Sequence, residues 1–181
     1  VEGVMSADLS NGFRLFASAS LNSSKFGSNY RTNENDPTTE VKTKADAQTA
    51  LRLHGAAGGP AGAPIFFSVD EPINAKTWNS LAVNWFRGIN SVLGAERTAV
   101  YGSNLVCGWA GDDGVIGHST TPGKRWAWQT KAWSGGALEP TAVLYQTEVV
   151  TASDPGAMID GVHVDVDNVL AADFGQWDLA R

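Results

Sequence analysis

The chain has 181 residues, of which only 18% are charged, and its formal net charge is −6. A chain of this length is most simply one domain, spanning residues 1–181, with room to bury a sizeable core. Its acidic balance argues against nucleic acid and anionic membrane surfaces as partners, since both need basic patches, and it contains no apolar run long enough for membrane insertion.

Helices and strands alternate through the first two thirds of the chain. Apolar stretches with Gly, Pro or Asn at their ends mark most of these elements. The predicted elements are, in order, a helix over residues 1–11, a strand over 13–21, a polar loop over 22–43, a helix over 45–57, a strand over 64–70, a helix over 75–93 capped by Asn74, a strand over 97–102 and a short helix over 104–110.

In the last third of the chain the alternation stops. Three strands, over residues 125–130, 142–147 and 162–167, follow with no convincing helix between them. Strand–helix alternation implies parallel pairing, which an open doubly wound sheet and an α/β barrel both satisfy. No glycine-rich phosphate turn of the doubly wound type is present, so the pattern favours a TIM-like (β/α) barrel. Six strands are visible where such a barrel has eight, so either the first two β/α units are missing or the barrel is incomplete.

The strand over residues 64–70 is the centre of the predicted fold, and it ends in two adjacent carboxylates, Asp70 and Glu71. Side chains alternate along a strand, so Asp70 shares a face with Phe66 and Ser68. Acids at strand ends of α/β folds are typical of functional sites, and burial beside Phe66 would raise the pKa of Asp70 toward that of a general acid. We predict Asp70 as the catalytic centre with Glu71 as its neighbour. The alternative is that Asp70 caps the next helix or pairs with a lysine.

A second pair of carboxylates, Asp165 and Asp167, lies in the last predicted strand on the same face as His163. In a barrel all strand ends open into one cavity, so Asp167 near the rim would assist Asp70. The alternative is that Asp165 is a hydrogen-bonded structural acid and that Asp167 caps the following turn. His163 is predicted to be a buried core histidine.

Aromatic and amide side chains recur at the predicted strand ends. An aromatic-Gln-Thr triplet occurs twice, at residues 128–130 and 145–147. Flat rings stack on the apolar faces of sugars and amides bind their hydroxyl or N-acetyl groups, so the predicted ligand is a carbohydrate. The alternative is that half of the rings fill the barrel interior. The predicted substrate-binding residues are Tyr101, Trp128, Gln129, Tyr145, Gln146 and Asp165.

No metal and no cofactor is predicted. The single cysteine, Cys107, excludes a thiolate metal site and is predicted to be a small buried hydrophobe on a helix. Three aspartates would suit a hard cation such as Mg²⁺ or Ca²⁺, but their spacing matches no recognised loop for either ion.

Several segments keep the order and spacing of a known family over roughly residues 12–177. They are residues 62–70, 100–102, 128–130 with Trp133, 144–146, and 165–168 with 174–177. On these segments the chain resembles the glycoside-hydrolase-like domain of actinobacterial secreted proteins and their phages (the DUF1906 or Rv2525c-like family), which is related in fold to family 25 lysozymes. The resemblance implies a modified β/α barrel whose last three strands are nearly helix-free. It also implies that residues 13–21 are the third strand, so that the first two are absent.

The resemblance implies glycoside hydrolysis, with one departure. Family 25 lysozymes carry Asp-x-Glu at the end of the fourth strand, where this chain has Ser68 and Asp70, or Glu71 if the register slips. The predicted function is a secreted or cell-wall-associated hydrolase of peptidoglycan or a related polysaccharide, with Asp70 as acid/base and Asp167 as its partner. The alternative is a non-catalytic carbohydrate-binding module that keeps the cleft. A metal-assisted hydrolase on the same barrel has the least support.

Overall fold

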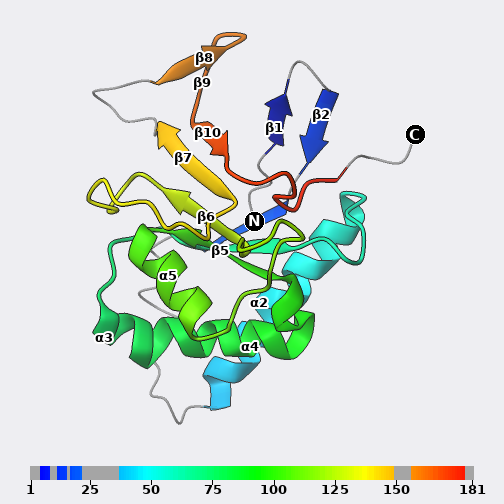
Figure 1. The fold of residues 1–181 in the computed structure, drawn as a ribbon. Coiled ribbons are helices and arrows are strands. Elements are labelled where there is room, and N and C mark those ends of the chain that lie inside the picture. The colour runs from blue at the N-terminus through cyan, green and yellow to red at the C-terminus, as the bar shows by residue number, and fades with distance from the viewer. Residues whose placement is uncertain (1–4, 9–11, 16, 22–36, 149–155, 178–181) are drawn as a thin grey trace.

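The computed structural model describes residues 5–8, 12–15, 17–21, 37–148 and 156–177 (Figure 1). Its strands are β1 (Met5–Asp8), β2 (Gly12–Leu15), β3 (Ala17–Leu21), β4 (Ile65–Val69), β5 (Thr98–Gly102), β6 (Ala127–Thr130), β7 (Leu144–Glu148), β8 (Ala157–Ile159), β9 (Val162–Val164) and β10 (Val166–Val169). Its helices are α2 (Pro37–Ala56), α3 (Ala75–Thr77), the π-helical η1 (Trp78–Ala82), α4 (Val83–Leu93), the short 3₁₀ helix η2 (Ala95–Arg97) and α5 (Asn104–Asp112).

Six strands form one sheet in the order β10-β7-β6-β5-β4-β3. The strands from β3 to β7 run parallel, and β10 joins β7 antiparallel at one edge. Two antiparallel hairpins, β1–β2 and β8–β9, lie outside this sheet, and β8–β9 projects beyond the end of β7 in Figure 1. The fold is therefore α/β with a mainly parallel sheet. Among the described residues, β3 and β10 are its two edges and no pairing joins them.

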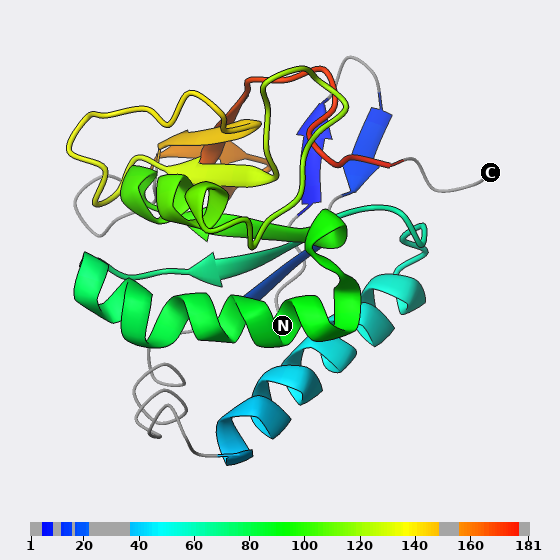
Figure 2. The ribbon, with the colours of Figure 1, turned by 60° about the horizontal axis from the view of Figure 1, so that its bottom comes forward.

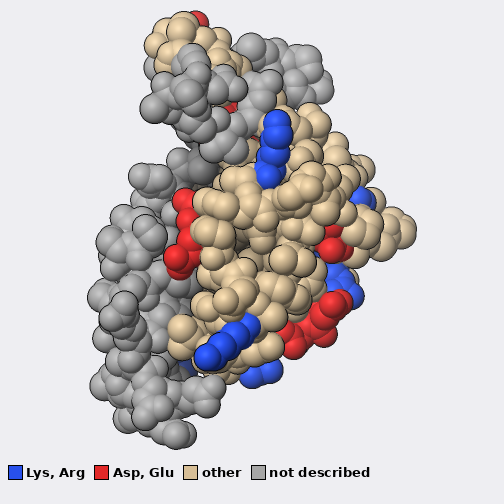
Figure 3. All heavy atoms as spheres, turned by 90° about the vertical axis from the view of Figure 1, so that its left-hand side faces the viewer, with Lys and Arg blue, Asp and Glu red and all other residues tan. Residues whose placement is uncertain are grey.

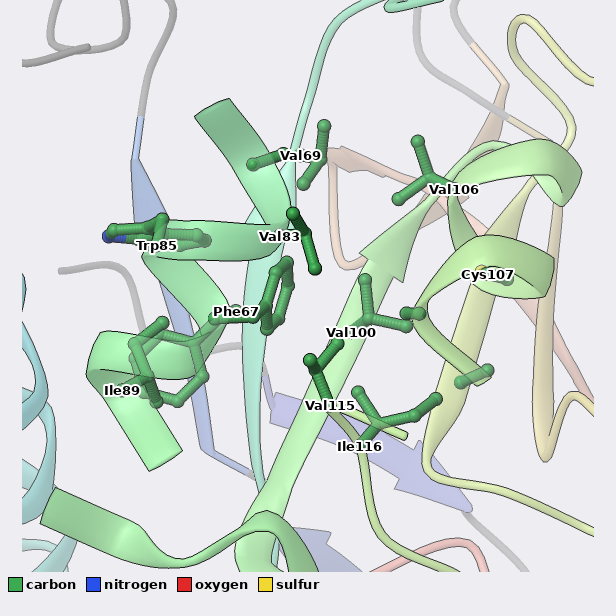
Figure 4. Close-up of a cluster of buried hydrophobic side chains, with 14 of the residues drawn as sticks. Phe67, Val69, Val83, Trp85, Ile89, Val100, Val106, Cys107, Val115 and Ile116 are labelled. Atoms are coloured by element: carbon green, nitrogen blue, oxygen red, sulfur yellow. The ribbon is translucent and has the colours of Figure 1, made fainter. Parts of the chain in front are cut away.

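The helices cover one face of the sheet (Figure 2). Side chains alternate between the two faces of a strand, so every second residue of a strand points toward the helices. On this face Phe67, Val69 and Val100 belong to one buried cluster with Trp85 and Ile89 of α4 and Val106 and Cys107 of α5 (Figure 4). The rings of Phe67 and Trp85 lie edge to face, with centroids 5.8 Å apart. Every residue of β4 is buried, as the apolar run predicted.

The opposite face of the sheet carries a second buried cluster. Its residues are Phe66, Ala99, Trp126, Trp128, Val143, Leu144, Ala171, Phe174 and Trp177. The C-terminal segment 171–177 that covers this face is fastened by Asp173, whose carboxylate accepts hydrogen bonds from the N–H and hydroxyl of Thr120 (2.9 and 2.5 Å). Burial alone would raise the pKa of Asp173, but these bonds lower it, so the acid is held in its charged form.

Most of the predicted elements are confirmed. The helix over residues 75–93 is α3, η1 and α4 in succession, and Asn74 begins it by accepting a hydrogen bond from the Thr77 N–H (2.9 Å). After α5 the described residues contain strands but no further helix, which agrees with the predicted helix-free last third. Cys107 is a buried residue of α5, as expected.

Three element predictions are corrected. Residues 5–8 form a strand rather than part of a helix, because pairing with β2 outweighs a weak helical spacing. The helix predicted from Ala45 begins at Pro37, a residue suited to a first helical turn, so the predicted loop shrinks to residues 22–36, which lie outside the described residues. The predicted last strand is interrupted at Asp165 and becomes β9 and β10.

Ile89→Ala tests how much the helix-facing core contributes to stability. Ile89 is fully buried, so the substitution removes apolar contacts and leaves a cavity. We expect the free energy of unfolding, measured by urea denaturation, to fall by about 2–4 kcal/mol. The control Ser91→Ala, at an exposed position of the same helix, is expected to change it by less than about 0.5 kcal/mol. Equal stabilities of the two variants would contradict this packing.

Candidate functional site

The carboxyl ends of the parallel strands bring polar side chains together on the face opposite the helices. The aligned positions at this edge are Ser68, Tyr101 and Trp128, followed one step further out by Thr130, Gln146 and Asp167. Residues that align across neighbouring strands point to the same side of a sheet, so these side chains share one face. This polar edge is the candidate site.

Asp167 combines partial burial with one directed hydrogen bond. Its Oδ1 accepts a hydrogen bond from the indole Nε1–H of Trp128 (2.7 Å). Burial raises the pKa of Asp167 to about 6, the bond from Trp128 opposes that rise, and the charge of Asp165 adds to it. A carboxyl group with this pKa is protonated in a useful fraction near neutral pH, which is the property of a general acid.

Gln146 links Tyr101 to Asp165. The Tyr101 hydroxyl donates to Gln146 Oε1 (2.7 Å), and Gln146 Nε2 donates to Asp165 Oδ2 (2.7 Å). Because one partner is a donor and the other a carboxylate, only one orientation of the amide satisfies both. Gln146 is therefore a buried crosslink between β5 and the start of β10.

The hydroxyl of Tyr101 lies within the electrostatic influence of three acids. Burial raises the pKa of its hydroxyl above the usual range, a hydrogen bond from the Thr130 side chain opposes the rise, and the charges of Asp70, Asp165 and Asp167 add to it. Tyr101 is thus a neutral hydrogen-bonding group rather than an acid or base at physiological pH. The sequence prediction missed Thr130, although its place at the end of the first triplet is a signal for it.

Asp70 lies at the open rim rather than in the interior. It directly follows β4, whose pairing with β5 is regular from Ile65 through Ser68. Asp70 is exposed, which corrects the expectation that burial beside Phe66 would tune it. β4 ends at Val69, so Asp70 lies one residue beyond the strand and its carboxylate is not covered by the sheet. Glu71 is half-buried at the following turn.

Trp128, Gln129 and Tyr145 do not present open surfaces for a ligand on this face. Trp128 is 3% exposed, and its ring lies edge-on to Tyr101 (5.0 Å), so it supports Asp167 rather than offering a free stacking face. Gln129 and Tyr145 align with each other on the opposite side of the sheet. The Gln129 amide is fully buried, donating to Ala137 O (2.7 Å) and accepting from the Glu139 N–H (2.6 Å).

Two histidines lie in contrasting environments. His163 is exposed on the β8–β9 hairpin, so the prediction of a core histidine is wrong, because the break at Asp165 moves it off the main sheet. His54, in the last turn of α2, is buried against Trp177 with ring centroids 5.0 Å apart. Within the described part of the chain, no three His, Cys, Asp or Glu side chains are arranged to hold a metal ion.

Comparison with known proteins agrees with this architecture. The family model for the "Rv2525c-like, glycoside hydrolase-like domain" matches residues 6–169. The chain belongs to this family. A curated relative in Mycobacterium tuberculosis, named "Putative peptidoglycan hydrolase Rv2525c", is 34% identical over 133 residues, which cover 72% of this chain and 50% of the relative. The chain thus spans about half the length of that relative.

Two crystal structures of the Tat-secreted Rv2525c from M. tuberculosis are similar to this family member. The complex with L-tartrate has a TM-score of 0.66 and 31% identity over 81% of this chain and 69% of the other. The complex with HEPES has a TM-score of 0.68 and 28% identity over 94% and 74%, respectively. In the described residues of the present chain, no helix combines the length and hydropathy needed to cross a membrane.

The raised pKa of Asp167 predicts a specific pH dependence of stability. Below pH 3.8 the folded and unfolded states are both protonated, so this group carries no penalty; between pH 3.8 and about 6 only the unfolded state releases the proton. Stability therefore falls as the pH rises through this window, by at most about 3 kcal/mol. Between pH 4 and 7, Asp167→Asn is expected to lose less unfolding free energy than the wild type, as measured by urea denaturation.

The matched control for this prediction is Asp160→Asn, at the exposed turn of β8–β9, where φ is +50° and asparagine is tolerated. It is expected to keep the wild-type pH dependence. The same slope in Asp167→Asn and the wild type would show that Asp167 does not titrate near pH 6.

Trp128→Phe tests the hydrogen bond itself. The substitution keeps an aromatic ring but removes the N–H that lowers the pKa of Asp167, so that pKa is expected to rise above about 6. Carboxyl-carbon NMR titration of Asp167 measures the shift directly. A lower pKa in the variant would show that the indole does not stabilise the charged form.

Proposed function

We propose that this chain is a glycoside hydrolase of cell-wall polysaccharide, with Asp167 as the general acid. The observation that carries the proposal is a half-buried carboxyl group, Asp167, held at the polar edge of the sheet by the indole N–H of Trp128. Burial there raises its pKa to about 6. The mainly parallel sheet is proposed to belong to a modified β/α barrel, in which this edge forms the mouth.

In the proposed reaction, the Asp167 carboxyl group donates its proton to the glycosidic oxygen as the bond to the sugar breaks. Asp70, exposed at the end of β4, supplies the second carboxylate that activates water or stabilises the positive charge on the sugar. These roles reverse those predicted from the sequence, because Asp167 is half-buried whereas Asp70 is exposed. Tyr101 and Gln146 hold the site in shape between the two acids.

The proposed substrate is the glycan of peptidoglycan, and the proposed location is outside the cell or at the cell wall. Two findings support this part of the proposal: the name of the curated relative refers to peptidoglycan hydrolysis, and the similar crystal structures are of a Tat-secreted protein. The acidic chain suits a carbohydrate better than an anionic polymer.

A second candidate function is carbohydrate binding without catalysis. Ser68 favours it, because this residue is 3% exposed and stands on β4 where the resemblance to family 25 lysozymes calls for the first acid. Such a module would keep the polar edge but would not need a protonated acid there.

Release of reducing ends from purified actinobacterial cell wall tests the hydrolase. Wild-type activity is expected to fall as the pH rises through about 6, since Asp167 must be protonated to act. Asp167→Asn is expected to lose activity at least about 100-fold, because it removes the proton donor. Asp70→Asn is expected to lose activity as well.

The control for these variants is Asp160→Asn, which changes the net charge by the same amount as the other two substitutions. Asp160 lies on the exposed hairpin turn. It is expected to remain as active as the wild type. Sugar binding by the wild type and all three variants, without any hydrolysis, would contradict the proposed hydrolase and support the carbohydrate-binding module. Full activity in Asp167→Asn would remove that residue from the mechanism.

A further inference from the structure

We propose that Trp133 is a stacking platform for a second sugar of the polysaccharide, beside the bond to be cleaved. This inference rests on the proposed function and adds a site for the glycan chain outside the acidic edge. Trp133 lies between β6 and β7, and its side chain is 44% exposed. The loop that joins these two strands is on the left of Figure 1. Figure 3 faces this side of the molecule, where tan, uncharged residues make up most of the described surface.

The loop is joined directly to the candidate site. The backbone N–H of Lys131 donates to the carbonyl of Gln146 (2.9 Å), the residue whose side chain links Tyr101 to Asp165. Only one residue separates Lys131 from Trp133 in the sequence. In the proposal, a sugar stacked on Trp133 and a sugar held at the acidic edge belong to the same glycan chain.

The loop is also rigid, which a platform requires. The hydroxyl of Ser134, which is 4% exposed, donates to Thr130 O (2.6 Å) and accepts from the Asn104 N–H (3.0 Å). The Gln129 amide holds the far end of the loop through Ala137. A loop backbone held in this way loses little conformational freedom when a ligand binds.

The backbone of Trp133 gives a second, independent sign of function. Its φ is +59°, in the left-handed region that disfavours bulky side chains, and nearby Gly135 and Gly136 show the residue type that this region favours. Trp133 lowers stability in two ways, because its apolar ring is exposed to water and its backbone is strained. Residues with strained backbones cluster at ligand-binding positions. An exposed indole face suits the apolar face of a pyranose ring.

Trp133→Gly separates a binding role from a structural one. Glycine removes the ring and relieves the left-handed φ, so the melting temperature is expected to stay level or rise. Binding is measured by calorimetry with soluble glycan strands prepared from peptidoglycan and with the disaccharide from the same strands. The Kd for long strands is expected to increase about tenfold, while the Kd for the disaccharide and kcat on saturating long strands stay unchanged.

Leu138→Ala is the matched control, because Leu138 lies in the same loop and is 51% exposed but offers no ring. It is expected to bind both glycans like the wild type. Unchanged binding of long strands by Trp133→Gly, an equal loss for strand and disaccharide, or a lower melting temperature would each overturn the platform while leaving the hydrolase intact. A wild-type chain that neither binds nor cleaves either glycan would overturn the proposed function, and the platform with it.

Discussion

The hydrogen bond between the Trp128 indole and the Asp167 carboxylate is the constraint on which the candidate site depends. Burial and the charge of Asp165 oppose ionisation of Asp167, and the indole N–H favours it, so that the pKa settles at about 6. The bond also determines where the carboxylate points. Trp128 is itself held edge-on between Phe66 and Tyr101, so the second buried cluster of the sheet supports the proposed acid directly.

The irregular pairing of β10 brings two acids to this place. In a regular strand, Asp165 and Asp167 would lie about 7 Å apart along one face. The register instead shifts between Val166 and Asp167, and the two acids bond to different strands: Asp165 to Gln146 on β7, and Asp167 to Trp128 on β6. Bulges of this kind redirect side chains near functional sites, and here both carboxylates come from β10 and the residue just before it.

The sequence predicted the position of the acids better than it predicted their environments. The apolar run of β4 is long enough to predict a buried strand, so the position of Asp70 at the end of that strand could be predicted as well. The two aromatic-Gln-Thr triplets look equivalent in sequence, but Trp128 aligns with Leu144, so the triplets are offset by one residue between β6 and β7. That offset turns Gln146 toward the site and Gln129 toward the helices, and no local pattern encodes it.

The cost in stability of the raised pKa of Asp167 bears on the choice between an enzyme and a binding module. A carboxyl group whose pKa is raised by burial destabilises the folded state at neutral pH, and asparagine at this position would accept the same bond from Trp128 without that penalty. A module that only binds sugar gains nothing from a group that titrates near pH 6. A hydrolase needs one, because a proton donor is effective only when its pKa lies near the working pH. The penalty carried by Asp167 therefore fits the proposed role of proton donor, although Ser68 stands in place of a lysozyme-type acid on β4.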